Sequence, residues 1–189
     1  MAEPLLALRE VACLRGGRML FEGLSLSLIA GTAALVTGPN GAGKSSLIRL
    51  AGGLLRPVAG EVVRPAAAAL ADEALALEER APLGRALAFW GGLDGREAGA
   101  GMAAMGLSGL ANVPVRMLST GQRKRAMLAR VLSSGAPLWL LDEPANGLDD
   151  EGLERLSAAM AEHRRSGGAV LAASHQRLVL PGAHEVALA

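Results

Sequence analysis

Gly38-Pro39-Asn40-Gly41-Ala42-Gly43-Lys44-Ser45-Ser46 is the stretch from which the fold of this chain can be predicted. It fits the pattern G-x-x-x-x-G-K-[ST], in which glycines allow consecutive backbone N–H groups to converge on phosphate oxygens. Residues 33–37 before it are typical of a buried strand, and residues 46–51 after it are typical of a helix. We therefore expect these nine residues to bind a nucleoside triphosphate, with Lys44 on the β- and γ-phosphates and Ser45 on Mg²⁺.

Length and composition suit one α/β domain with a substantial core. The chain has 189 residues, of which 51% are apolar but only 2% aromatic, so alanine, leucine and glycine must fill the core. The net charge of +1 argues against a surface that coats nucleic acid, and no nucleic-acid partner is expected. The lone Cys13 allows neither an internal disulfide nor a zinc cluster, which favours a reducing cytosolic setting.

Neither a signal peptide nor a membrane span is expected. Glu3, Arg9 and Glu10 interrupt the first apolar residues, and no apolar run approaches the ~18 residues that a membrane helix needs. We predict a chain that is soluble or docked onto a membrane partner.

Short strands are predicted on both sides of the glycine-rich stretch. Residues 5–11 and 24–28 are typical of strands, the second with strict alternation, and a turn is expected at residues 15–18. The helix should end at residues 52–57, before another short strand over residues 60–64. These patterns predict a small antiparallel layer ahead of a parallel core.

The next 50 residues are harder to assign. The composition of residues 66–77 favours a helix, although a strand over residues 67–70 is also possible. Further helices are predicted at residues 82–90, 98–105 and 107–110.

We interpret residues 80–117, approximately, as a helical insert within a single domain that spans residues 1–189. The tail from Gln176 to Ala189 is too short to form a further domain.

A second stretch, Leu118-Ser119-Thr120-Gly121-Gln122-Arg123-Lys124-Arg125, precedes an amphipathic helix. Ser119 suits a helix N-cap, and Gly121 permits close approach of another backbone. A serine hydroxyl and three cations here could form a second phosphate site. On these residues alone, an ordinary cap with a solvated basic turn is the favoured interpretation.

Two further strands end in polar side chains at the sheet edge where ligands bind in open α/β folds. Residues 138–144 form an apolar run that ends in Asp142 and Glu143, and successive strand residues point to opposite faces. Asp142 therefore suits the Mg²⁺ shell and Glu143 a base that polarises the attacking water. A final strand over residues 169–175 ends in His175. The sequence fits a functional role and a structural role for this histidine equally well.

In order and approximate spacing, GPNGAGKSS, LSTGQR, LWLLDEP, NGLD and SH resemble the ATP-binding cassette family over nearly the whole chain. The resemblance implies an α/β fold: a phosphate-loop core of mainly parallel sheet, an N-terminal antiparallel β layer and a helical insert. It implies ATP and Mg²⁺ as ligands, and a dimer in which two copies sandwich two ATP molecules head to tail.

The same resemblance implies a role for each matching residue. Asp142 would be the magnesium-associated acid, Glu143 the catalytic glutamate, His175 the switch histidine and Asp149 the end of the D-loop. Ser119, Thr120, Gly121 and Gln122 would form the signature motif, which contacts the γ-phosphate held by Lys44 of the second copy.

Three features depart from the family pattern. Thr120 stands where glycine is usual. The chain has no tyrosine to stack on adenine, and Arg15 lies near that position and could stack its guanidinium plane instead. A glutamine usually found between the phosphate loop and the signature is missing, and Asp72 or Glu73 lies nearest.

Within the family, the chain is most similar to the ATP-binding subunit of the haem exporter of cytochrome c maturation. The supporting features are its short length, Ala88-Phe89-Trp90, the run from Pro137 to Pro144 followed by Asn146-Gly147-Leu148-Asp149, and the brief ending after His175.

By this likeness the partners are an integral membrane subunit of the haem exporter and a second copy of the chain. The location is peripheral, on the cytoplasmic side of the bacterial inner membrane. Surface, switch and tail positions would explain His163, His175 and His184, so the chain itself is not expected to bind haem. A transporter of lipid, peptide or drug, or a soluble cassette ATPase, is the alternative.

Overall fold

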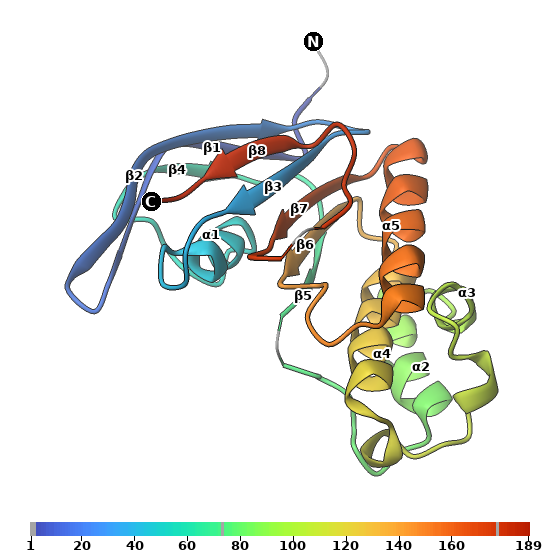
Figure 1. The fold of residues 1–189 in the computed structure, drawn as a ribbon. Helices are drawn as coiled ribbons and strands as arrows, with labels where there is room; N and C mark the ends of the chain where they lie inside the picture. The colour runs from blue at the N-terminus through green and yellow to red at the C-terminus, as the bar shows by residue number, and fades with distance from the viewer. Residues whose placement is uncertain (1–2, 73, 177) are drawn as a thin grey trace.

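The computed structural model describes residues 3–72, 74–176 and 178–189. It contains two sheets, with one helix between them and the other helices on the far side of the larger sheet (Figure 1). The predicted α/β fold with an antiparallel layer and a helical insert is confirmed.

The smaller sheet is antiparallel and has the strand order β2-β1-β4. Its strands are β1 (Leu6–Arg15), β2 (Arg18–Leu28) and β4 (Ala59–Val63). The turn between β1 and β2 uses Gly16 and Gly17 at positive φ, as the sequence predicts, but both strands are longer than expected. Inward-facing leucines such as Leu6 and Leu8 bury one face of this sheet against the rest of the molecule.

The larger sheet is parallel and has the strand order β5-β6-β7-β3-β8. Its strands are β3 (Ala33–Thr37), β5 (Ala68–Ala71), β6 (Leu138–Asp142), β7 (Ala169–Ala173) and β8 (His184–Ala187). Of the two possibilities for residues 66–77, the strand is the one that forms, because β5 pairs with β6 at the edge of the sheet. β8 was not predicted: the short tail supplies a strand that pairs with β3.

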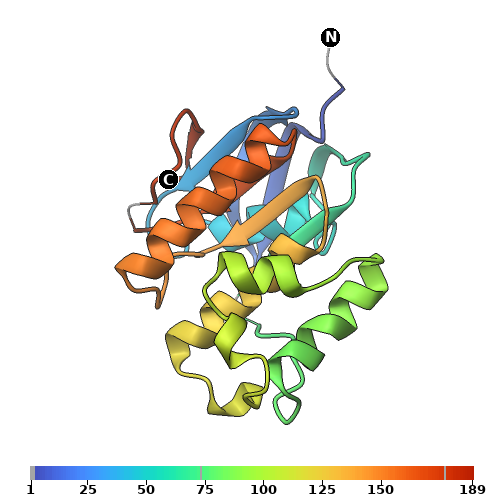
Figure 2. The ribbon, with the colours of Figure 1, turned by 90° about the vertical axis from the view of Figure 1, so that its right-hand side faces the viewer.

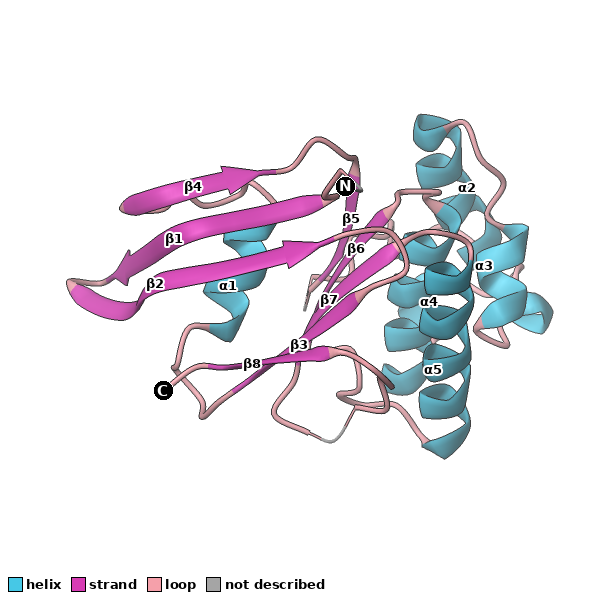
Figure 3. Ribbon diagram, turned by 90° about the horizontal axis from the view of Figure 1, so that it is seen from above, coloured by secondary structure: helices cyan, strands magenta, loops and turns pink. Residues whose placement is uncertain are grey.

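Alternation along the parallel strands divides the core into two clusters. Leu138 and Leu140 face the antiparallel sheet and α1 (Lys44–Ala51), whereas Trp139 and Leu141 face the opposite side. Figure 3 shows α1 near the antiparallel strands and the remaining helices on the opposite side of the parallel sheet.

The helices on that opposite side are α2 (Leu83–Asp94), α3 (Gly99–Ala104), α4 (Thr120–Ser133) and α5 (Asp150–Arg165), with 3₁₀ turns η1 (Ser108–Leu110) and η2 (Val115–Met117). α2, α3 and the two turns lie together beside α4 and form a helical part distinct from the sheets (Figure 2). Here α3 rests directly on α4, because a Cβ at Gly101 would lie 2.3 Å from the Ala129 carbonyl oxygen. α2, α3, η1 and η2 lie within residues 80–117, where the helical insert was expected. The division of the chain into one domain with this insert stays a prediction.

One histidine does not occupy the position expected from the sequence. His163 is not a free surface residue: its ring is half-buried and stacks on Trp139, with 3.8 Å between ring centroids and 7° between planes. His184 does lie in the tail, as an exposed residue of β8.

Candidate active site

The predicted phosphate loop connects the end of β3 to the start of α1 (Figure 1). Gly38, Gly41 and Gly43 have φ values of 140°, 84° and 105°, a region that glycine adopts without strain. A Cβ at Gly38 would also lie 2.4 Å from the Leu188 carbonyl oxygen, so the loop packs closely against the end of the chain. Gly43 is the N-cap of α1 and has no side chain to offer its first N–H groups, which favours binding of an anion there.

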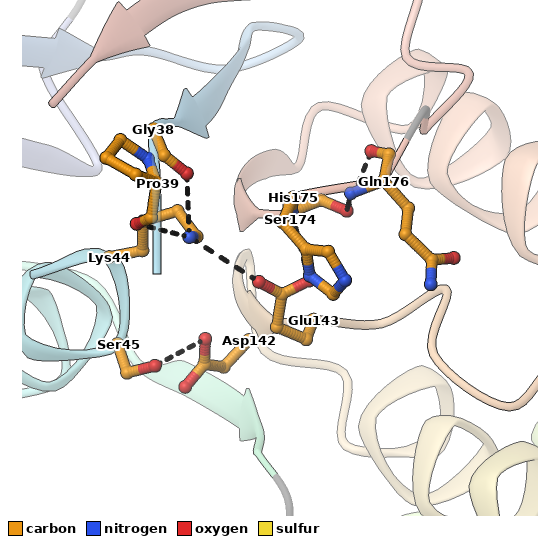
Figure 4. Close-up of polar contacts among 9 residues, drawn as sticks. All are labelled: Gly38, Pro39, Lys44, Ser45, Asp142, Glu143, Ser174, His175 and Gln176. Carbon is orange, nitrogen blue, oxygen red and sulfur yellow. Dashed lines mark hydrogen bonds and ion pairs between the residues drawn. The ribbon is translucent and has the colours of Figure 1, made fainter. Parts of the chain in front are cut away.

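Lys44 folds back over this loop. Its Nζ donates hydrogen bonds to the carbonyl oxygens of Gly38, at 2.9 Å, and Pro39, at 3.1 Å (Figure 4). The residue is 6% exposed, and Nζ lies 3.9 Å from Oε1 of Glu143. The ammonium group is therefore held at the mouth of the loop by acceptors weaker than phosphate oxygens.

Ser45 and Asp142 form the second contact across the site. The Ser45 hydroxyl donates to Oδ1 of Asp142 at 3.0 Å, joining the first turn of α1 to the end of β6. Burial and the nearby Glu143 raise the pKa of the Asp142 carboxyl, whereas the Ser45 hydrogen bond lowers it. A hydroxyl and a buried carboxylate side by side are hard oxygen ligands that fit Mg²⁺, and the cation would offset the cost of ionising Asp142.

Glu143 leaves the strand at a sharp change of backbone direction. Its φ of 47° lies in the left-handed region that a non-glycine residue adopts only under constraint, and its N–H donates to the Ala173 carbonyl at 2.8 Å. The two carboxylates have different partners: Asp142 lies against Ser45, and Glu143 against Lys44 and His175 (Figure 4). From the sequence we expected strand alternation to place Asp142 and Glu143 on opposite faces. That reason is wrong, because β6 ends at Asp142 and Glu143 lies after it.

His175 meets Glu143 twice. Its backbone N–H donates to Oε2 of Glu143 at 3.1 Å, and its Nδ1 lies 2.9 Å from the same oxygen (Figure 4). Ser174 fixes the turn that follows β7, since its hydroxyl donates to the Gln176 carbonyl and accepts from the Gln176 N–H. Ser174 was not singled out from the sequence; a buried serine directly before a histidine at a strand end is the signal that could have identified it.

The signature residues do not belong to this cluster within one copy. Ser119 caps α4 by accepting from the Gln122 N–H, and the Gln122 side chain accepts from the Ser119 N–H in return. Thr120 is the first residue of α4. In Figure 1 the start of α4 lies at the lower end of the helical part, well apart from the loop between β3 and α1.

Gly121 and Asp149 mark where this helix meets the loop before α5. A Cβ at Gly121 would lie 3.1 Å from the Gly147 carbonyl oxygen, so the glycine permits a close backbone approach. Asp149 caps α5 by accepting from the Gly152 N–H at 2.9 Å. The predicted D-loop aspartate therefore has a structural task in the isolated chain.

Arg15 lies beside the predicted phosphate loop. A cavity of about 280 Å³ is lined by Arg15, Leu20, Gly41, Gly43, Lys44, Ser45 and Ser46. Leu20 was not considered from the sequence, and its Cβ lies 3.1 Å from the position of a Cβ at Gly43. Of the other loop residues, Ala42 is buried, whereas Pro39 and Asn40 are exposed.

The position that lacks the expected glutamine follows β5. The Asp72 carboxylate accepts from the Ala74 N–H at 3.0 Å, which stabilises a local turn, and Glu73 lies outside the described residues.

One edge of the parallel sheet thus brings together Lys44, Ser45, Asp142, Glu143 and His175 (Figure 4). A buried cation, a hydroxyl–carboxylate pair and a carboxylate oriented by a histidine are the groups needed to bind a triphosphate and orient water toward it.

Comparisons with known proteins agree with this chemistry. A sequence model described as "ABC transporter" matches residues 21–146. A curated protein of Sphingopyxis alaskensis, the cytochrome c biogenesis ATP-binding export protein CcmA, is 59% identical over 187 residues, covering 97% of this chain and 96% of that protein. The protein of the same name from Novosphingobium aromaticivorans is 54% identical over 188 residues, covering 100% and 97%.

A solved structure, an ATP-binding subunit of an ABC transporter, superimposes with a TM-score of 0.85 at 21% identity, covering 97% of this chain and 85% of that one. At this identity the likeness shows the shared fold.

Proposed function

The chain belongs to the ABC transporter family, and from that premise we propose that it is the ATP-hydrolysing subunit of a transporter that serves c-type cytochrome biogenesis. The transported or released species would be haem or a haem-loaded chaperone. The observation that carries the proposal is identity of 54–59% over nearly the full length of proteins named for ATP-driven export in cytochrome c biogenesis.

Binding of ATP depends on the loop between β3 and α1. The backbone N–H groups of residues 38–46 and the first turn of α1 receive the phosphates, and Lys44 exchanges its carbonyl partners for the β- and γ-phosphate oxygens. Ser45 and Asp142 would hold Mg²⁺, which neutralises charge on the phosphates when bound. Arg15 and Leu20 would contact the base.

Hydrolysis depends on Glu143. Its carboxylate orients a water molecule toward the γ-phosphate and accepts a proton from it, while His175 holds Oε2 and can contact the γ-phosphate. The Glu143 carboxylate lies near Lys44, whereas Asp142 accepts the hydrogen bond of Ser45. Glu143 can therefore orient the water while Asp142 binds the cation.

The site is completed by a second copy of the chain. Ser119, Thr120, Gly121 and Gln122 of one copy would close on the γ-phosphate held by Lys44 of the other, in a two-fold arrangement. The start of α4 suits this role, because a helix N-terminus favours a phosphate and Arg123 and Arg125 add positive charge nearby. The distance between the two motifs within one copy explains why neither site is complete alone (Figure 1).

The partner that uses this hydrolysis would be an integral membrane subunit. Among the described residues, no helix combines the length and apolar composition that crossing a bilayer requires. Peripheral attachment on the cytoplasmic side of the bacterial inner membrane follows from the proposed partner.

We place the contact with that subunit on the groove between β5 and α2. A cavity of about 820 Å³ there is lined by apolar residues, among them Ala66–Ala69 and Trp90, and by charged residues, among them Asp72, Arg96 and Arg130. Leu54, which belongs to this lining, is a large apolar residue that is 66% exposed. An apolar and charged groove of this kind suits a cytoplasmic segment of a membrane protein.

The ATPase of another transporter, moving lipid, peptide or drug, is the second candidate within the family. Loss of c-type cytochromes on deletion of the gene, and co-purification with a membrane subunit of the haem system, would support cytochrome biogenesis. Intact cytochromes in the deletion strain would exclude it.

The decisive variant for the hydrolytic mechanism is Glu143→Gln. It keeps the shape of the side chain and removes the base, so we expect ATP binding to persist while turnover falls by about 10²–10⁴-fold. Dimers locked on ATP should accumulate and be visible by light scattering after size-exclusion chromatography. Glu154→Gln, on an exposed position of α5, is the matched control and should keep wild-type turnover. Wild-type turnover in Glu143→Gln would remove Glu143 from its proposed role.

A further inference from the structure

α5 and the helical part share a hydrophobic cluster, and the long side chain of Arg155 adds a hydrogen bond between them. Nη1 of Arg155 donates to the Ala104 carbonyl oxygen at 3.2 Å, linking α5 to the last residue of α3. The same guanidinium pairs with Glu151, one turn earlier on α5, through Nε at 2.9 Å and Nη2 at 2.8 Å. The Glu151 carboxylate therefore holds the guanidinium in the orientation that reaches α3.

The surface that receives Arg155 fits it closely. Gly106 has a φ of 66° and ends the turn after α3, and the position of a Cβ there would lie 2.9 Å from Cζ of Arg155. A Cβ at this position would therefore displace the guanidinium. A cation beside the carbonyl oxygens at the end of a helix is also electrostatically favourable.

α3 in turn is fixed on the helix that carries the signature. The Ser133 hydroxyl of α4 donates to the Ala98 carbonyl at 3.3 Å, and Gly101 brings the α3 backbone against Ala129. A continuous set of contacts therefore runs from Arg155 through α3 to α4, whose N-cap is Ser119.

The remainder of α5 is attached to the catalytic core. The Ser157 hydroxyl donates to the Val179 carbonyl at 3.2 Å, and Arg164 donates to Gly31 at 3.0 Å and to Pro181 at 2.6 Å. Val179 and Pro181 belong to the segment that follows His175. α5 therefore lies between the histidine segment and the helical part, and Figure 2 shows it spanning from the sheets toward the helices below.

We propose that Arg155 is a positioning residue that holds the helical part, and with it Ser119, in the orientation needed to close on the ATP of a second copy. This rests on the proposed function, because it requires the head-to-tail dimer. Arg155 acts through α3 and α4. Loss of its contact with Ala104 lets the helical part adopt other orientations, and closure then carries a larger entropic cost.

The test compares dimer formation in the Glu143→Gln background with Mg²⁺-ATP present, measured by sedimentation velocity across a concentration series. We expect Arg155→Gln to weaken the dimer about five- to tenfold, the range for loss of one partly exposed charged hydrogen bond. Arg155→Lys, which keeps one donor for Ala104, should lose less. Arg165→Gln, which removes an exposed pair with Glu162 on the same helix, should leave the dimer unchanged.

A second measurement separates positioning from a local defect. Binding of ATP to dilute single copies, measured by filter binding, should change by less than about twofold in Arg155→Gln. If Arg155→Gln and Arg165→Gln dimerise equally well, the inference is overturned and the proposed function stays intact. The same holds if single copies of Arg155→Gln lose ATP affinity by the same factor as the dimer is weakened. If the Glu143→Gln parent itself forms no ATP-dependent dimer, the head-to-tail assembly and the inference both fail.

Discussion

Lys44 illustrates how the site is prepared for its ligand by residues of the same loop. The ammonium is nearly buried, yet its two hydrogen bonds go to the neutral carbonyl oxygens of Gly38 and Pro39. Oε1 of the Glu143 carboxylate lies 3.9 Å from Nζ. A buried cation with only neutral close acceptors binds incoming phosphate oxygens strongly, because charge-assisted hydrogen bonds are about twice as strong as neutral ones.

Replacement of this ammonium should therefore slow hydrolysis strongly. We expect Lys44→Ala to lower kcat/KM for ATP by about 10²–10³-fold, the effect of removing one preorganised contact to developing charge, or about 2.7–4 kcal/mol. Steady-state phosphate release measures it. Lys44→Met keeps most of the buried volume and removes only the charge, so it should lose as much activity as Lys44→Ala. Retained activity and nucleotide affinity in Lys44→Met would contradict the phosphate-loop assignment.

For single residues, the sequence predicts which side chains belong to the site more readily than it predicts how they are oriented. The spacing of Gly38, Gly43, Lys44 and Ser45 was sufficient to predict a loop between strand and helix, because few other structures need that pattern. The direction of Glu143 could not be predicted, since its backbone has a left-handed φ that residue types do not reveal for a glutamate. Arg15, with only the general chemistry of guanidinium stacking to support it, stays a prediction.

At the scale of elements, long periodic segments were predicted well and short alanine-rich ones were not. Residues 66–77 have high helix propensity, yet β5 forms because pairing with β6 and burial of Ala69 and Ala71 outweigh that propensity. β8 has too few residues for a clear alternation, and its partner β3 lies about 150 positions earlier in the chain. Such long-range pairing is invisible to a local pattern.

The packing of α5 on β6 contains a histidine that makes stability depend on pH. Burial lowers the pKa of His163 below its usual 6.5, while Nε2 lies 3.2 Å from the Pro137 carbonyl oxygen and the ring stacks on Trp139. The folded state therefore binds this proton less readily than the unfolded state. As pH falls below 6.5, the free energy of unfolding decreases until the pH reaches the lowered pKa.

His163→Phe should remove that dependence. The phenyl ring can keep the stack on Trp139, and the Pro137 carbonyl still accepts from the Ala169 N–H at 2.8 Å. We expect the wild-type Tm to fall between pH 7 and pH 5 by about 2–4 °C more than that of the variant, which for this length corresponds to about 1 kcal/mol. Differential scanning calorimetry measures the difference. His184→Phe, at an exposed position, is the control, and parallel curves for wild type and His163→Phe would contradict the assignment.

For the whole molecule, the fold could be predicted from the sequence, but the contact between α5 and the helical part could not. Ordered motifs predict two sheets and a helical insert, since their spacing fits one architecture. Arg155 carries no motif, and its partner Ala104 lies 51 positions away with only a backbone oxygen to offer. Contacts of a side chain with a distant carbonyl leave no trace in residue types, so the link between α5 and the helical part required the structure.

The assembly of two copies can be tested at Ser119 without disturbing the fold of one. Ser119→Asp preserves the N-cap of α4, because aspartate caps as well as serine, but places a negative charge where the other copy's γ-phosphate should arrive. We expect dilute single copies to bind ATP normally, while turnover at high protein concentration falls by about 10²-fold, comparable to losing a charge-stabilising contact. Ser119→Thr, which keeps hydroxyl and cap, should stay active. Full turnover in Ser119→Asp would show that this serine never meets the phosphate and that hydrolysis needs no second copy in the proposed orientation.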